Sequence, residues 1–122
     1  MIINYLQLLI EDVRQREIYR KLQTCLNMSQ QYEKQKEIYQ NANEADRKKI
    51  AEELVTLTRN STRCVHRVFD YADVRPRLNA TNKAVISIIY SKDEEVDKSN
   101  DPVMIDARGS YDVWKIIPSM WE

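Results

Sequence analysis

The stretch I-A-E-E-L-V-T-L-T-R-N-S-T-R-C-V-H-R-V-F-D-Y, residues 50–71, decides the fold. Its apolar and small side chains recur at alternating intervals of four and three residues, at Ile50, Leu54, Leu57, Ser61, Cys64, Val68 and Tyr71. This spacing is typical of a helix that packs along one seam against another helix, as in a coiled coil. Asn41 or Asn43 can cap the start of the helix, and Pro76 disfavours helical geometry at Arg75. We therefore expect a helix over about residues 44–73.

A second amphipathic pattern precedes this helix. Asn4 and Gln7 have the spacing of a capping box. Apolar residues then return at helical intervals from Leu6 to Leu26 and become sparse towards Tyr39. The pattern predicts a helix over about residues 4–40. Because only a few residues connect the two helices, they should lie antiparallel as neighbours, so that residues 1–74 form a long α-hairpin.

The last third of the chain has a different composition. Residues 83–91, K-A-V-I-S-I-I-Y-S, are rich in β-branched side chains and favour a strand, with a helix as the alternative. Gly109 separates two further apolar runs and can supply the positive φ that a hairpin turn often requires. We expect a small antiparallel β-element, at about residues 83–91, 102–106 and 111–117. The expected fold class is α+β, mainly α.

The chain is expected to form a single domain over residues 1–122. Within it, residues 1–74 would be the hairpin, and residues 75–122 would be a β-rich part packed on the open end of that hairpin. This arrangement would place the β-element beside the apolar N-terminus.

The charge balance limits the classes of partner. Nineteen basic and nineteen acidic residues give a formal net charge of zero, so the whole molecule does not attract nucleic acid or an anionic membrane. The first ten residues are apolar, but they are too short to span a bilayer and lack the basic leader of a signal peptide. We expect a cytoplasmic protein without a membrane partner, whose cysteines are free thiols.

The reactive side chains do not form a recognisable catalytic pattern. Cys64 and His66 are two residues apart on a helix and point about 200° away from each other, which excludes a nucleophile–base pair. Cys25 and Cys64 are expected to pack as small hydrophobes, since a turn near residue 42 offsets them by several residues unless the turn shifts. The acidic run at residues 93–97 lacks the glycine of an EF-hand loop. We identify no metal, cofactor or small-molecule substrate site, and we expect no enzymatic activity.

Five arginines form the strongest local charge pattern, which we call the arginine flank: Arg59, Arg63, Arg67, Arg75 and Arg77. The first three share one helical face, and the planar guanidinium suits phosphate and carboxylate groups. Two interpretations are open. Acids of the first helix could pair with this face, with Arg67 level with Glu17 and Asp70 level with Arg14. Alternatively, the arginines could be free for nucleic acid or for an acidic protein surface.

The apolar residues extend beyond one seam, so the hairpin needs a third layer. The C-terminal part, a second copy or another protein could supply it. Tyr32, Tyr39, Met120 and Trp121 are candidate contact residues, because Tyr and Trp contribute strongly to binding at interfaces. We expect a non-enzymatic protein-interaction module that docks on a protein partner or assembles with itself, such as a small subunit or an accessory or inhibitory protein, viral ones included. The alternative is a nucleic-acid-binding protein that uses the arginine flank.

Overall fold

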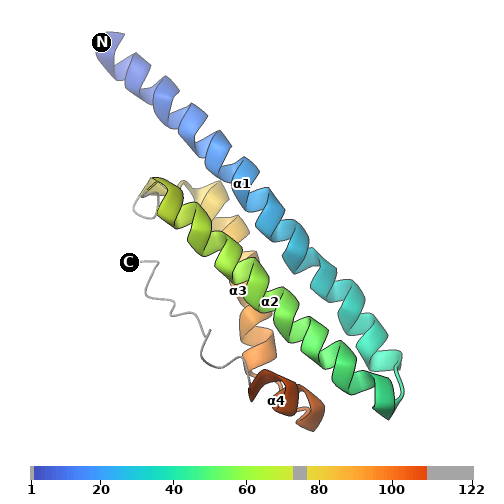
Figure 1. Cartoon of the computed structure of the whole chain (residues 1–122). Helices are drawn as coiled ribbons and strands as arrows, with labels where there is room; N and C mark the ends of the chain where they lie inside the picture. The colour runs from blue at the N-terminus through green and yellow to red at the C-terminus, as the bar shows by residue number, and fades with distance from the viewer. Residues whose placement is uncertain (1, 73–76, 110–122) are drawn as a thin grey trace.

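The computed structural model describes residues 2–72 and 77–109. Four helices follow one another in chain order, namely α1 (Ile2–Asn41), α2 (Glu44–Ala72), α3 (Ala80–Asp97) and α4 (Pro102–Arg108), as Figure 1 shows. The predicted α-hairpin is confirmed, because α1 and α2 are long antiparallel neighbours with boundaries close to the expected ones. None of the described helices combines the length and the apolar character needed to cross a membrane.

The two predicted helix caps have different outcomes. Asn43 caps α2, since its Oδ1 accepts a hydrogen bond of 2.9 Å from the backbone amide of Asp46. The predicted cap at Asn4 is wrong, because α1 begins at Ile2 and already includes Asn4. The start of α2 is therefore fixed by local chemistry that the sequence shows directly.

The predicted β-element is wrong. Residues 83–91 lie in α3, residues 102–106 lie in α4, and the structure contains no strand within residues 2–72 and 77–109. The fold is all-α rather than α+β. The third predicted strand, at residues 111–117, lies outside the described residues.

Burial explains why residues 83–91 are helical. Val85, Ile86 and Ile89 are buried together on one side of α3, at intervals that suit a helix and not a strand. Asn79 provides the start, because its Oδ1 accepts a hydrogen bond of 2.9 Å from the backbone amide of Asn82. Packing on the hairpin thus outweighs the β-propensity of the branched side chains.

A second local start signal produces α4. Asp101 caps it by accepting a hydrogen bond of 3.0 Å from the amide of Val103, and Pro102 occupies the first turn, where its missing N–H is not needed. Nη1 of Arg108 then donates to the carbonyl oxygens of Val96 and Asp97, each at 2.7 Å. Arg108 therefore adds a side-chain donor to carbonyl groups at the end of α3, where the helix itself supplies few donors.

The third layer over the hairpin is α3, with α4 at its end. One apolar cluster joins α1, α2 and α3 through residues that include Leu22, Val65 and Ile86. A second cluster, nearer the hairpin tip, includes Leu54 and Met104. Within the described residues the C-terminal part is not confined to the open end of the hairpin, because α3 lies along the hairpin and packs against both of its helices.

Cys25 and Cys64 form a disulfide between α1 and α2, with their Cα atoms 5.4 Å apart. The expectation of free thiols is therefore wrong. The expected offset between the two cysteines was counted from a turn near residue 42, with the last turn of α1 level with the first turn of α2. Figure 1 shows instead that the first turn of α2 begins beyond the last turn of α1, and this shift of about one turn brings the cysteines level. Cys25 is fully buried, so the disulfide lies within the core.

Candidate functional site

The arginine flank does not stay together on the surface. Arg59 is among the most deeply buried large side chains, with 1% of its side-chain surface exposed. Its guanidinium forms ion pairs with Asp93 and Asp97, which lie one turn apart on α3. This confirms intramolecular pairing for Arg59, but the partners come from α3 and not from α1.

The other four arginines lie in different environments. Arg63 is partly buried, and Arg67 and Arg77 are exposed. Arg75 lies outside the described residues, as do the candidate contact residues Met120 and Trp121. The buried position of Arg59 removes it from any surface that could contact a phosphate backbone.

The two predicted ion pairs between the hairpin helices do not form. Glu17 lies 3.5 Å from Arg20, and Arg14 lies 3.8 Å from Glu11, all within α1. The shift of about one turn between α1 and α2 explains this result, because it moves Arg67 and Asp70 away from the levels that simple counting gives them.

Sequence reasoning missed the acidic partners of Arg59. The predicted β-element places the run that contains Asp93 and Asp97 in the connection between two strands. The four-residue interval between the two aspartates places them on the same side of a helix, and this was the available signal. The signal has meaning only if the segment is helical, so the error in secondary structure concealed the ion pairs.

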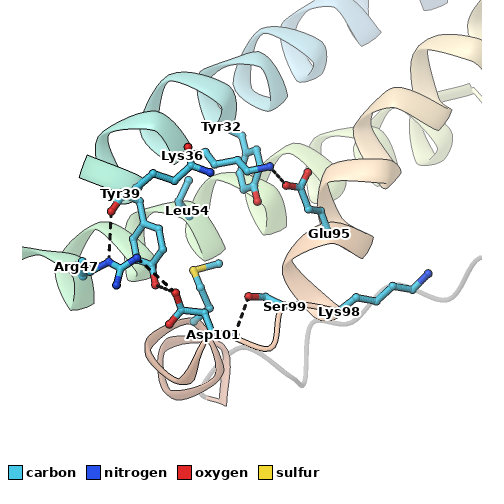
Figure 2. A pocket seen from close by; sticks show the side chains of 11 residues that line it. Tyr32, Lys36, Tyr39, Arg47, Leu54, Glu95, Lys98, Ser99 and Asp101 are labelled. Atoms are coloured by element: carbon cyan, nitrogen blue, oxygen red, sulfur yellow. Dashed lines mark hydrogen bonds and ion pairs between the residues drawn. The ribbon is translucent and has the colours of Figure 1, made fainter. Parts of the chain in front are cut away.

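Tyr32 and Tyr39 line a cleft of about 640 Å³ near the hairpin tip, between α1, α2 and the α3–α4 connection (Figure 2). Lys36 reaches across the cleft to form an ion pair with Glu95. The Tyr39 hydroxyl donates a hydrogen bond of 2.5 Å to Asp101. Both tyrosines are therefore buried contacts within the chain.

The cleft alters the acidity of its phenol and carboxyl groups. Burial, supported by the hydrogen bond to Asp101, raises the pKa of Tyr39 to about 12. The same hydrogen bond holds the pKa of Asp101 below its ordinary value. Burial also raises the pKa of Tyr32, with a smaller contribution from the carboxylate of Glu95. These directions stabilise a protonated tyrosine next to an ionised aspartate at neutral pH.

The cations of the cleft have acidic partners. Arg47 lies 3.8 Å from Asp101, and its guanidinium carbon is 4.7 Å from the ring centre of Tyr39. Lys98 lies 3.8 Å from Glu94. These ion pairs and the hydrogen bond of Tyr39 hold the α3–α4 connection against the hairpin.

Among residues 4–70 and 77–109, the largest group of exposed apolar side chains lies at the other end of the hairpin, in the N-terminal part of α1. The disulfide places Cys64 level with Cys25, so the end of α2 at Ala72 is level with about residue 17 of α1. The first turns of α1 therefore extend past the end of α2, as Figure 1 shows. We call residues 4–13 the projection. Among the described residues ten large apolar side chains are exposed, and six of them lie in the projection, with exposed fractions of 44% to 69%: Tyr5, Leu6, Leu8, Leu9, Ile10 and Val13.

The apolar side chains of the projection are centred on a different side of α1 from those of the core, although Ile10 and Val13 line a groove with Val68 of α2. Leu9 and Ile18 are nine residues apart, which is two and a half turns of α-helix, so they point in opposite directions. The same interval separates Val13 from Leu22. Ile18 and Leu22 are buried against the other helices, whereas Leu9 and Val13 are exposed. The apolar side of α1 thus changes face between residues 13 and 18.

Gln15 holds α1 at the base of the projection. Its Nε2 donates a hydrogen bond of 2.6 Å to the carbonyl oxygen of Arg77, and its Oε1 accepts one of 2.7 Å from Nδ2 of Asn82. Its backbone carbonyl accepts a further hydrogen bond of 3.2 Å from Asn82. These bonds attach α1 to the start of α3, so the projection extends from a fixed base.

No family model, no curated protein and no solved structure matches this chain.

Proposed function

We propose that this protein is a docking module that binds another protein chain through the projection of α1. The supporting observation is the group of exposed apolar side chains on residues 5–13, where α1 extends past the end of α2. Contiguous apolar surface of this kind marks binding sites more often than isolated exposed residues do. The partner would contact the projection as one helix contacts another, with side chains at intervals of three and four residues.

The anchoring of α1 favours this role. The Cys25–Cys64 disulfide and the hydrogen bonds of Gln15 hold the helix where it leaves the rest of the molecule. A helix held in this way presents its apolar side chains without having to fold when it binds, which reduces the entropy lost on association.

The nucleic-acid alternative stays a prediction with less support. The arginine flank contributes Arg67 and Arg77 to the described surface, while Arg59 is buried with two aspartates. A test of that alternative is whether any binding to DNA or RNA weakens steeply as salt is raised, as counterion release requires.

A photo-crosslinking experiment tests the docking proposal. A photoreactive phenylalanine analogue replaces Leu8, which is 69% exposed, and the matched control carries the analogue at Lys34, an exposed position of α1 outside the projection. Irradiation in the cells that make the protein should give discrete protein adducts from position 8 and none of the same mass from position 34. The mass of each adduct distinguishes a second copy of this chain from a different protein.

The proposal is overturned if position 8, and a second probe at Val13, form no protein adduct that is absent from the control. If the chain instead co-sediments with lipid membranes from the same cells, the apolar side chains of the projection would be assigned to a membrane surface.

A further inference from the structure

Five residues on an exposed side of α1, next to the start of α3, form a seam that continues from the projection towards the middle of the helix. They recur at intervals of four and three residues: Tyr5, Leu9, Asp12, Arg16 and Tyr19. All five side chains are exposed. Intervals of this kind keep side chains on one line along the helix, as in the seam of a coiled coil. We call this set the outer seam.

The outer seam is complementary to itself when reversed. In an antiparallel pair related by a two-fold axis near residue 14, Leu9 faces Tyr19 of the partner subunit, and Asp12 faces Arg16 of the partner subunit. Because of the symmetry, each contact occurs twice. Acids therefore meet bases in the centre, with apolar pairs on both sides.

The order of charges along α1 selects this orientation. The acids Glu11 and Asp12 precede the bases Arg16 and Arg20. Two parallel copies in register would place Asp12 against Asp12 and Arg16 against Arg16, and like charges in such positions are unfavourable. Antiparallel copies place opposite charges together at the same positions.

The existing ion pairs on this face offer little resistance to such an exchange. Asp12 and Arg16 lie 2.5 Å apart within one helix, and both side chains are more than half exposed. An exposed pair of this type contributes little to stability. Each side chain can therefore turn to the partner subunit, where the surrounding apolar residues would shield the new pair from water.

We propose that two copies of this chain associate antiparallel along the outer seam, and this proposal rests on the docking function proposed for the projection. The apolar residues Leu6, Leu8 and Val13 lie beside the seam and widen the contact. The paired length, from Tyr5 to about Gln23, is roughly 27 Å at the rise of an α-helix. A contact of this length buries an area near the lower end of specific interfaces, roughly 1,200 Å² in total, so we expect micromolar self-association.

Sedimentation equilibrium of the full chain tests this proposal through a charge exchange. The wild-type protein should form a dimer with a dissociation constant in the micromolar range. Asp12→Arg alone, or Arg16→Asp alone, places like charges at both central contacts and should weaken the dimer at least tenfold. The double variant Asp12→Arg/Arg16→Asp restores opposite charges and should return the constant to within about threefold of wild type.

A matched control and a negative result complete the design. Gln7→Arg adds a positive charge to the opposite face of the projection and should leave the dimer unchanged. A single reversal without effect, or a double variant as weak as the single ones, overturns the antiparallel register. A wild-type chain that stays monomeric up to about 500 μM overturns self-association, yet the crosslinking at Leu8 would still decide whether the projection docks on a different protein. Far-ultraviolet circular dichroism checks that every variant keeps its helix content.

Discussion

Replacing Arg59 by methionine tests whether the buried ion pairs hold α3 on the hairpin. The Arg59 side chain is 1% exposed, and those of Asp93 and Asp97 are 6% and 16% exposed. Removal of the guanidinium takes the ion pair with Arg59 away from the buried Asp93 carboxylate. Breaking a buried pair from one side typically lowers the free energy of unfolding by about 3–5 kcal/mol. With a urea dependence of roughly 2 kcal/mol per molar, the midpoint of unfolding should fall by about 2 M.

Two comparison variants show whether the loss of stability comes from the buried charges. Arg67→Met removes an exposed arginine of the same helix and should change the free energy of unfolding by less than about 0.5 kcal/mol. The double variant Arg59→Met/Asp93→Leu removes both buried charges and should recover most of the lost stability. Equal midpoints for Arg59→Met and Arg67→Met would refute the reasoning.

Three other predictions concern the disulfide, the cleft and a helix cap. Reduction of the Cys25–Cys64 bond should lower the free energy of unfolding by about 4 kcal/mol on the chain-entropy relation, because the bond closes a sequence separation of 39 residues. In urea titrations, the Cys25→Ala/Cys64→Ala variant should show no further response to reductant. Burial raises the pKa of Tyr39 from 10.0 to about 12. The stability supplied by its protonated phenol is therefore complete below pH 10 and is lost between pH 10 and 12. In thermal melts, Tyr39→Phe should lose less stability over that range than the wild-type protein. Asn79→Ala removes the cap of α3 and should lower the free energy of unfolding by about 1 kcal/mol, whereas Asn79→Ser should retain most of it.

The hairpin was predictable because its signals are local and repeated. The regular intervals in residues 50–71 and the cap at Asn43 act over a few residues, and both appear in the structure as expected. The register between α1 and α2 was not predictable from counting, because the connection advances along the hairpin before α2 begins. That advance brings Cys25 level with Cys64 and separates Arg67 from Glu17.

The fold of residues 83–91 illustrates a limit of composition. Val85, Ile86 and Ile89 favour strands as residue types, but their spacing suits one side of a helix when Asn82 and Val96 are considered with them. Nine residues alone fit either a strand or a helix, and only the longer pattern from Asn82 to Val96 favours the helix. The sequence places four polar residues, Arg14 to Glu17, between the two apolar parts of α1, but it does not show that the apolar side of the helix changes there.

The continuity of α1 has a consequence for how the projection stays helical. The first turn of an isolated helix is difficult to form, and short helices are therefore marginal in water. Residues 4–13 avoid this step, because they extend a helix whose later turns are already held in the core beside Cys25. Only the easier addition of one residue at a time remains. A proline at Gln15 would interrupt this continuation and leave the preceding segment as a short peptide that must nucleate by itself.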